Sequence, residues 1–415
     1  MSNTLPTKEQ LLPTRQQLEF LSWEIGVFFH FGIRTFYEGH RDWDGKPMPL
    51  EGFNPVQLDC ESWIRTVKAA GGKYAILVCK HHDGFANWPS KYTEYGVHNT
   101  PWKGGKGDVV QEFVEACRKH DIKVGLYYSP AEMGYTERSP KEHDDYFINQ
   151  IGELLTGYGK IDYLWFDGCG SEGHDYDEPR IIQAIRMMQP EILIFNMWDP
   201  DVRWVGNEGG IAHFNNSNLV SELDFSVMTD EASSLSEQKF LPAECDFMMR
   251  DQWFYSEYDT DHVKSVEELM GIYYYSVGRG ANFLINIGPD RRGLLPEVDA
   301  SRLIEFGNEV RRKFANPIDS TVEKTENGFS IKLDKGRLIN HVILREDLTL
   351  GEHVEEFEIA VKAPVLHQSA VVHIGRTIGH KRIIPVPPIE AVQVIIRVTK
   401  SSGPIELLSP EIYYC

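Results

Sequence analysis

The sequence predicts an α/β fold: a (β/α)8-like, TIM-type barrel over residues 1–316, followed by an antiparallel β-sandwich domain over residues 317–415. In the first part of the chain, short uninterrupted apolar runs alternate with amphipathic helical patterns. Such runs are typical of parallel strands whose two faces are both covered by helices. A doubly wound sheet is the alternative, but no glycine-rich phosphate loop follows the first apolar run.

Six apolar runs are the expected barrel strands. They cover residues 25–31, 74–79, 123–129, 162–166, 191–196 and 281–288. Helical patterns, with apolar residues three and four positions apart, begin near residues 60, 108, 144, 179, 265 and 296. Residues 197–253 are rich in Trp, Asn and Gly and show no periodicity that assigns an element, so a degenerate barrel unit could lie there.

The pattern changes after Asn316 and Pro317, where β-branched residues alternate with polar ones and turn residues separate the runs. The N-G pair at residues 327–328 and the D-K-G triplet at residues 334–336 predict hairpins. This part of the chain is therefore expected to form the antiparallel sandwich.

The composition limits the partners. A net charge of −20 argues against nucleic acid and anionic membranes, which would repel the protein. The first 20 residues lack the apolar segment of a secretory signal, and the six cysteines form no C-x-x-C pair, so we expect reduced thiols and a cytoplasmic protein. No run approaches the roughly 20 apolar residues that span a bilayer. A homo-oligomer is compatible with the sequence.

Polar and aromatic residues stand where the expected strands end, and in a barrel these ends line the active site. Hydroxyl groups need directional donors and acceptors, and aromatic faces cover C–H surface, so this set suits a neutral polyhydroxylated ligand. The residues are His30, His81, His82, Asp83, Tyr127 or Tyr128, Asp167, Asn196, Trp198 and Asn286.

Asp167 is the most specific residue of this set. It ends the run YLWF, with Trp165 two positions before it on the same face of the strand, and Gly168 allows close approach. An aspartate after a strand is commonly a helix N-cap, but residues 169–171 open no obvious helix. We therefore interpret Asp167 as functional.

A glycosidase needs a second carboxyl group that protonates the leaving oxygen. Glu208, in the glycine-containing stretch RWVGNEGG, and Glu244, in LPAECD, are evenly matched on spacing alone. Glu222 and Glu132 are weaker candidates.

The adjacent residues His81 and His82 raise the alternative of a metal site. On a strand, neighbouring side chains point to opposite faces, so the two histidines would not share one ion. No H-E-x-x-H spacing and no G-x-S-x-G elbow occur. We expect no metal and no serine nucleophile.

Several motifs together resemble glycoside hydrolase family 29, the α-L-fucosidases. They are WEIGVFFHFGI, GGKYAILVCKHHDGFANWPSKYTEYGV, KVGLYYSP, YLWFDG and VGRGANFLINIGPDRRGLLP, in this order. PDVRWVGNEGG and LPAECDFMMRDQWFY are similar to the branch of the family that is selective for α-1,3/1,4-linked fucose. The resemblance implies a barrel with a β-sandwich, retention through a covalent fucosyl-enzyme, a fucosylated oligosaccharide as substrate, and no cofactor.

The resemblance also implies roles for single residues. Asp167 matches the nucleophile, and the G-N-E motif favours Glu208 over Glu244 as acid/base, with Glu244 kept as a further residue of the site. The residues that match substrate-binding positions are His30, His81, His82, Tyr127, Trp165 and Trp43, with Asp42 where the family usually has glutamate. Phe31, where the family commonly has Trp, and the segment SPAEM depart from the pattern. On this interpretation one or both adjacent histidines bind fucose hydroxyls and Asp83 braces them.

Two other classes stay open: a fucose-binding protein without catalysis, and a glycosidase of other specificity or a metal-dependent hydrolase. The presence of both carboxyl groups argues against loss of catalysis.

Overall fold

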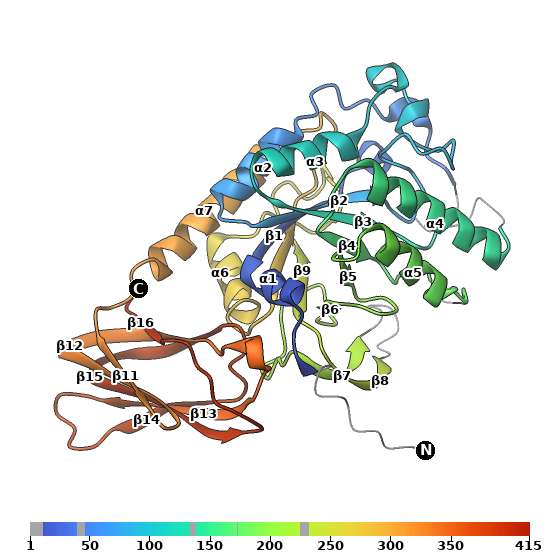
Figure 1. The fold of residues 1–415 in the computed structure, drawn as a ribbon. Helices are drawn as coiled ribbons and strands as arrows, with labels where there is room; N and C mark the ends of the chain where they lie inside the picture. The colour runs from blue at the N-terminus through green and yellow to red at the C-terminus, as the bar shows by residue number, and fades with distance from the viewer. Residues whose placement is uncertain (1–10, 40–45, 133–137, 172, 225–231) are drawn as a thin grey trace.

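The computed structural model describes residues 11–39, 46–132, 138–171, 173–224 and 232–415 (Figure 1). A helix-surrounded barrel makes up most of the chain, and a smaller all-β domain lies beside it. Each part has its own hydrophobic core.

Eight parallel strands form the barrel, which confirms the predicted fold class. Their order is β5-β4-β3-β2-β1-β10-β9-β6, and one parallel bridge between Phe195 and Val202 joins the two ends of the sheet. The strands are β1 (Ile25–Phe29), β2 (Tyr74–Lys80), β3 (Lys123–Tyr128), β4 (Tyr163–Phe166), β5 (Leu193–Phe195), β6 (Arg203–Trp204), β9 (Ala243–Met248) and β10 (Asn282–Asn286). Every residue of β1, β2, β4, β5 and β10 is buried, as uninterrupted apolar runs require.

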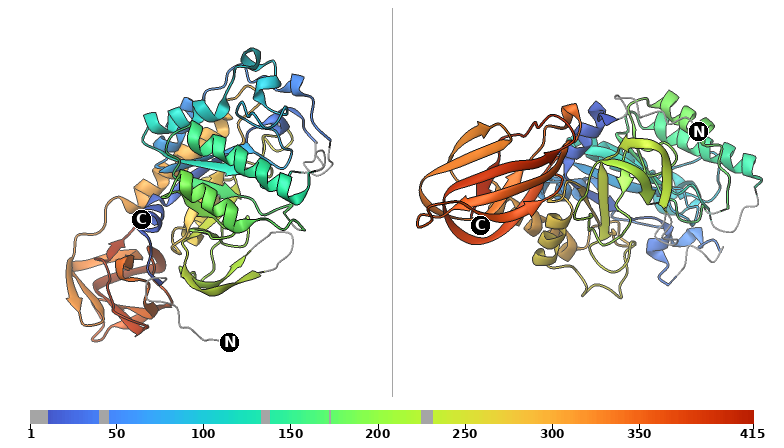
Figure 2. Two further views of the ribbon diagram at one scale, coloured as in Figure 1. Left: turned by 45° about the vertical axis from the view of Figure 1, so that its right-hand side comes forward. Right: turned by 90° about the horizontal axis from the view of Figure 1, so that it is seen from below.

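Helices cover the outside of the barrel (Figure 2). Polar caps set where several of them begin: Asp108 caps α3, and Ser139 and Ser265 form capping boxes at α4 and α6. The helices are α1 (Arg15–Trp23), α2 (Cys60–Ala69), α3 (Val109–Lys119), α4 (Pro140–Gly157), α5 (Glu178–Met188), α6 (Val266–Tyr275) and α7 (Glu297–Phe314).

Residues 197–253 depart from the regular repeat. In the described part of the chain no helix separates β5 from β6, and a hairpin of β7 (Leu219–Asp224) and β8 (Ala232–Phe240) replaces the helix between β6 and β9. This is the degenerate unit that the sequence pattern allowed. The segment after β6 instead lies against the barrel, where Gly209 forms an antiparallel bridge with Phe247 of β9.

The second domain is one antiparallel sheet in the order β11-β12-β15-β13-β14, with β16 paired to β12. Register shifts bend the two long strands β12 and β15, and the sheet folds into two layers around its own core (Figure 2). The N-G pair joins β11 to β12 as predicted, but the hairpin predicted at residues 334–336 is wrong, because these residues lie inside β12 at a register shift. The strands are β11 (Thr321–Thr325), β12 (Gly328–Leu344), β13 (Val354–Lys362), β14 (Ala370–Gly375), β15 (Arg382–Ser401) and β16 (Glu411–Tyr413).

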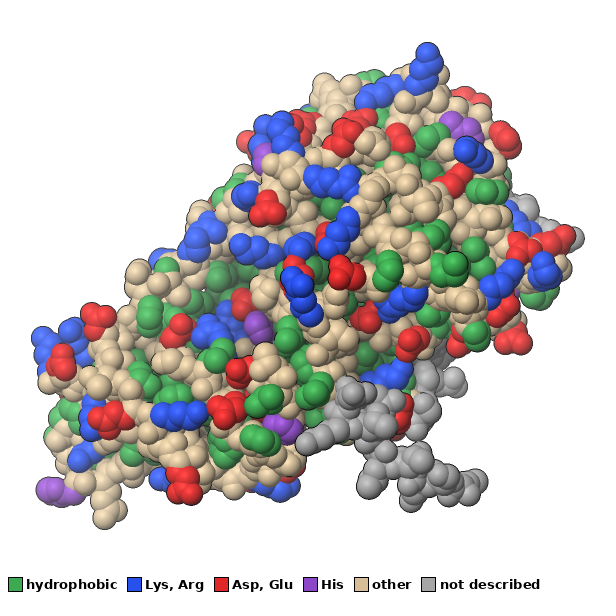
Figure 3. Space-filling view, viewed as in Figure 1, with side chains coloured by type: hydrophobic (Ala, Val, Ile, Leu, Met, Phe, Trp, Pro, Cys, Tyr) green, Lys and Arg blue, Asp and Glu red, His purple; other side chains and the backbone are tan. Residues whose placement is uncertain are grey.

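The two domains meet through both polar and aromatic contacts. Tyr274 of α6 and His341 of β12 lie within hydrogen-bonding distance (Oη to Nε2, 2.8 Å), and Lys381 pairs with Glu24 at 2.8 Å. Acidic and basic side chains are interspersed over the face of the molecule drawn in Figure 3. No helix among the described residues is long and apolar enough to cross a membrane.

Candidate active site

A cavity of about 280 Å³ opens where the barrel strands end. It brings together most of the residues singled out from the sequence. Those that line it are His30, His81, His82, Tyr127, Trp165, Asp167, Asn196 and Glu208. Aromatic rings and polar groups therefore line the same cavity, as the binding of a sugar-sized polar ligand requires.

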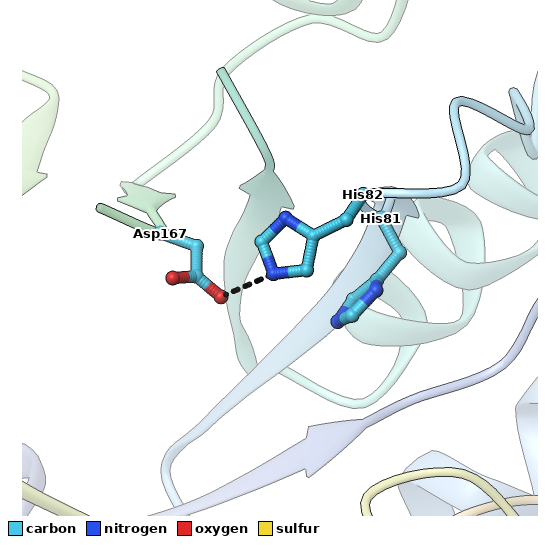
Figure 4. Close-up of side chains that lie close together, drawn as sticks. All are labelled: His81, His82 and Asp167. Atoms are coloured by element: carbon cyan, nitrogen blue, oxygen red, sulfur yellow. Dashed lines mark ion pairs between the residues drawn. The ribbon is translucent and has the colours of Figure 1, made fainter. Parts of the chain in front are cut away.

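Asp167 follows β4 directly, and three groups hold its carboxylate. Tyr127 donates a hydrogen bond from its hydroxyl to Oδ2 at 2.7 Å, and the backbone amide of Cys169 donates to Oδ1 at 2.9 Å. His82 Nε2 lies 3.3 Å from Oδ2, and a dashed line marks this pair in Figure 4. The contact with Cys169 closes a turn and not a helix, since the next helix begins only at Glu178.

The pKa of Asp167 is lowered below its ordinary value. Burial alone would raise this pKa, but the nearby His82 ring and the hydrogen bonds from His82 and Cys169 outweigh burial. The carboxylate is therefore ionised and oriented, and a quarter of the side chain remains exposed. This is the state that a nucleophile needs.

The expectation that His81 and His82 point to opposite faces is wrong. β2 ends at Lys80, and the chain turns at once, because the amide of Gly84 donates to the carbonyl of His81. Strand alternation then no longer applies, and the two rings line the same cavity with centroids 4.3 Å apart. His81 also stacks on Tyr127, with centroids 5.5 Å apart and planes 11° from parallel.

The residues fit a hydrogen-bonded network better than a metal site. His81, His82 and Asp167 offer ligand atoms within 4.8 Å of one another. However, His82 directs Nδ1 to the hydroxyl of Ser129 at 2.7 Å and Nε2 to Asp167, whose Oδ2 also accepts from Tyr127. These contacts thus orient the His82 ring and the Asp167 carboxylate. Asp83 closes its own turn by accepting a hydrogen bond from the Phe85 amide.

The tautomer of His30 follows from its neighbour Asn286. The Asn286 amide nitrogen donates to the carbonyl of Trp253 at 2.7 Å, so its oxygen is the atom 2.8 Å from His30 Nδ1. Nδ1 must then carry the proton, which leaves Nε2 as an acceptor. Burial and the neighbouring His81 lower the pKa of His30 well below its ordinary value, so the ring is neutral. A neutral imidazole of this kind can accept a hydrogen bond from a sugar hydroxyl.

Glu208 lies on the segment that replaces a regular barrel helix. Gly206 and Gly210, both with positive φ, shape the turns on either side, and the Gly209–Phe247 bridge holds the segment against β9. Burial raises the pKa of Glu208, and the charge of Asp167 raises it further. A hydrogen bond from the Trp253 side chain opposes this shift but does not cancel it. Glu208 has the environment of a proton donor.

Glu244 does not line the cavity. Its side chain is fully buried below it, where Oε1 accepts from Tyr163 and Trp165 and Oε2 accepts from Tyr74, at 2.6–3.0 Å. Burial raises its pKa to about 7 despite these three donors. Glu244 therefore positions Trp165, which does line the cavity.

The other two acid candidates lie elsewhere. Glu132 pairs with Arg138 at 2.7 Å, and Glu222 is exposed on the β7–β8 hairpin. Tyr128 donates to Gln150 and does not line the cavity, so Tyr127 is the tyrosine of the site.

Sequence reasoning missed Asp246, Trp204, Trp253 and Arg34, all of which line the cavity. Asp246 is 4% exposed and accepts a hydrogen bond from Trp204 Nε1 at 2.7 Å. Burial and the charge of Glu208 raise its pKa well above the ordinary value. The available signal was strand periodicity: two positions beyond Glu244, Asp246 points to the same interior of the barrel, one layer nearer the cavity.

Asp42 and Trp43 lie outside the described residues. Phe31 is buried and packs on Phe53 and Trp63, so it belongs to the core beside the site.

The fold and the site together define a class of protein. An ionised carboxylate and a second carboxyl group with a raised pKa face one cavity at the carboxyl end of a parallel barrel, which is the arrangement of a glycoside hydrolase.

Comparison with known proteins identifies the family. Residues 48–313 match the family model described as Alpha-L-fucosidase. The chain is 32% identical to Alpha-L-fucosidase 1 of Arabidopsis thaliana, over 90% of this chain and 81% of the relative. A solved putative alpha-L-fucosidase of Bacteroides thetaiotaomicron superposes with a TM-score of 0.89 at 31% identity, covering 99% of both chains. A putative alpha-L-fucosidase of Bacteroides ovatus gives 0.88 at 34% identity, covering 99% of this chain and 77% of the other. The chain belongs to the α-L-fucosidase family of glycoside hydrolases, family 29.

The raised pKa of Glu244 predicts a specific dependence of stability on pH. The carboxyl group ionises near pH 7 in the folded protein and near its ordinary value of 4.5 when unfolded. The folded state therefore holds this proton more tightly, and the group's contribution to stability falls as pH rises from about 4.5 to about 7. Glu244→Gln keeps the group neutral, so the melting temperature of this variant relative to the wild type should rise between pH 5 and pH 8. Differential scanning calorimetry at both pH values measures this difference, and a constant difference would contradict the assignment.

Proposed function

We propose that this α-L-fucosidase is a retaining enzyme that releases α-1,3/1,4-linked fucose from N-acetylglucosamine-containing glycans through a covalent fucosyl-Asp167 intermediate. The observation that carries the proposal is the contrast between two carboxyl groups on one cavity. Asp167 has a lowered pKa and Glu208 a raised one. When their environments give two carboxyl groups different pKa values, the group with the lower pKa acts as the nucleophile and the group with the higher pKa as the acid.

In the first step, a carboxylate oxygen of Asp167 attacks the anomeric carbon of fucose. The bond from this carbon to the leaving oxygen breaks, and protonated Glu208 gives its proton to that oxygen. Retention requires the two carboxyl groups about 5–5.5 Å apart, so that Asp167 reaches carbon from one side and Glu208 reaches the leaving oxygen from the other.

The second step follows from the charge that the first step removes. The negative charge of Asp167 is one cause of the raised pKa of Glu208, and the fucosyl ester is neutral. The pKa of Glu208, now ionised, falls, and the carboxylate can take a proton from water as the water attacks the anomeric carbon. Hydrolysis of the ester then restores the charge on Asp167, which raises the pKa of Glu208 again.

The histidines support fucose as the bound sugar. His30 offers a neutral acceptor at Nε2, and His81 stands beside it with ring centroids 5.6 Å apart. Both lie on the same cavity as Trp165 and Trp253, whose faces can cover the C–H surface and methyl group of the sugar.

The linkage proposal rests on the segments that resemble the α-1,3/1,4-selective branch. RWVGNEGG supplies Trp204 and Glu208 to the cavity wall, and AECDFMMRDQW supplies Asp246 and Trp253. Both motifs therefore stand beside the proposed acid/base, on the side where the leaving sugar would lie. Contacts to that sugar and its branches could be used to orient the reacting bond.

Replacing the nucleophile tests the mechanism. Asp167→Gly should lower turnover of an aryl fucoside by at least about 10³-fold while the fold is kept, because the attacking carboxylate is lost. Added azide should restore cleavage partly and yield the β-fucosyl azide, identified by NMR. An active Asp167→Gly enzyme without azide would contradict the assignment, and activity lost from the wild type on adding a chelator would indicate a metal-dependent hydrolase.

Replacing the acid/base tests its identity. Glu208→Ala should slow cleavage of natural glycosides by roughly 10²–10⁴-fold, and cleavage of an activated aryl fucoside much less, because a good leaving group needs little protonation. kcat/KM for both substrates measures the difference. Equal losses on both substrates would refute the role, and a leaving-group-dependent loss from Asp246→Asn would assign it to Asp246.

Linkage selectivity has its own test. A Lewis-type trisaccharide or fucosyl-α-1,3-N-acetylglucosamine should be cleaved with a kcat/KM well above that of α-1,2-linked fucosyl-lactose, because differential binding of the transition state sets discrimination. Released fucose measured by chromatography gives both values. Faster cleavage of the α-1,2 linkage would refute the branch assignment and leave the fucosidase activity itself in place.

A further inference from the structure

Two buried carboxyl groups meet at the junction of the two domains, far along the chain from the active-site carboxylates. Glu346 follows β12 and Glu352 precedes β13, both in the second domain, and Asn218 precedes β7 in the barrel domain. Their exposed fractions are 3%, 4% and 2%, so none of the three reaches bulk water.

In each of the two carboxyl groups, only one oxygen accepts hydrogen bonds. Glu352 Oε2 accepts from the backbone amide of Asn218 at 3.0 Å and from its side-chain nitrogen at 2.7 Å. Glu346 Oε1 accepts from the amides of His353 at 2.7 Å and Val354 at 3.1 Å. Glu346 Oε2, Glu352 Oε1 and Asn218 Oδ1 are buried and have no hydrogen-bond partner among the described residues.

Gly379 of the second domain lies beside the side chains of Asn218 and Glu352 and is hydrogen-bonded to the backbone of Glu346. The amide of Glu346 donates to the Gly379 carbonyl at 2.9 Å. A Cβ atom on Gly379 would lie 3.8 Å from both Asn218 Nδ2 and Glu352 Oε2. Burial raises the pKa of Glu346 to about 7, the hydrogen bond from the His353 amide opposes this shift, and the charge of Glu352 adds to it. The two carboxyl groups are therefore close enough to repel each other.

Among the described residues, no lysine or arginine donates a hydrogen bond to Glu346 or Glu352. Arg382 interacts electrostatically with Glu352, but its guanidinium donates to the carbonyl and hydroxyl of Thr377 and to the carbonyl of Phe214. Two buried carboxylates without a paired cation are costly, and the cost is avoided by protonation or by binding a cation.

The available ligand atoms are oxygens only, two from carboxylates and one from an amide. Hard divalent cations prefer such donors, and calcium accepts irregular sets of them, completed by backbone carbonyls and water. We propose that Glu346, Glu352 and Asn218 form a calcium-binding site that joins the two domains.

The proposed site lies at one end of the segment that carries Glu208. Asn218 ends the irregular segment that begins after β6 and carries Glu208. Within this segment Asn216 accepts from Arg203 Nη2 at 2.5 Å, so Asn216 is also tied back to β6. A cation at the junction would fix the far end of this segment to the second domain.

Calcium titration of the full-length protein tests the proposal. After treatment with a chelator and its removal, calcium chloride should raise the melting temperature by about 3–5 °C, saturably. Isothermal titration calorimetry should show one calcium per chain. Glu346→Gln and Glu352→Gln should each remove the shift and the binding heat. The control variant is Glu355→Gln on the nearby strand β13, which removes a carboxylate paired with Lys400 and should keep both.

Other results would overturn the proposal. The same calcium shift in Glu346→Gln and Glu352→Gln would show binding elsewhere. If calcium has no effect and the wild type instead gains stability relative to Glu346→Gln as pH falls from 8 to 5, Glu346 is neutralised by a proton and no cation site exists. Folding of the Gln variants is checked by their aryl-fucosidase activity, since neither residue lines the active-site cavity.

Discussion

The active site depends on keeping one carboxylate ionised inside a largely buried cavity. Burial alone would raise the pKa of Asp167, and the nearby His82 ring with the hydrogen bonds from His82 and the Cys169 amide lowers it. The two side chains that hold the carboxylate come from other strands of the barrel. Tyr127 belongs to β3, whose register places it beside Trp165 of β4, and His82 follows β2, which pairs with β3 in turn. The parallel pairing therefore does more than build a core: it places the side chains that hold the Asp167 carboxylate.

The barrel interior separates carboxyl groups by depth and by environment. Glu244 lies in a closed layer among Tyr74, Tyr163 and Trp165, whereas Asp246, two residues further along β9, reaches the cavity. Four acidic residues thus stand in or just below the site, and only Asp167 has a lowered pKa. The environment of each side chain thus separates one carboxylate with a lowered pKa from three carboxyl groups with raised pKa values.

Sequence reasoning succeeded where one strong pattern determines the structure. Uninterrupted apolar runs predicted parallel strands, and the end of the run YLWF located Asp167 at the mouth of the barrel. Sequence reasoning failed where a local pattern was applied to residues outside the strand or turn for which the pattern holds. Alternation was applied to His81 and His82 although β2 had already ended, and a turn signal at residues 334–336 proved to be an irregular position inside β12.

Asp246 was missed for a related reason. No strand had been assigned within residues 197–253, so the two-residue period that links Asp246 to Glu244 was not available. The choice between Glu208 and Glu244 likewise required knowing how deep each side chain lies in the barrel, and the spacing of residues along the sequence does not give this depth. Both precede small or apolar residues, but only Glu208 reaches the cavity. The resemblance to a family favoured Glu208, and the burial of Glu244 keeps its carboxyl group out of the cavity.

The second domain compensates for the helix that the barrel lacks. An irregular segment between β6 and β7 exposes backbone carbonyls that a helix would have satisfied internally. Instead, Arg382 donates to the carbonyl of Phe214, and Thr377 donates to that of Asn216. Residues 376–382 of the second domain thus take over part of a helix's role for the chain that leads away from Glu208. The irregular unit can place Glu208 on the cavity that Asp167 lines because hydrogen bonds of this unit are completed from outside the barrel.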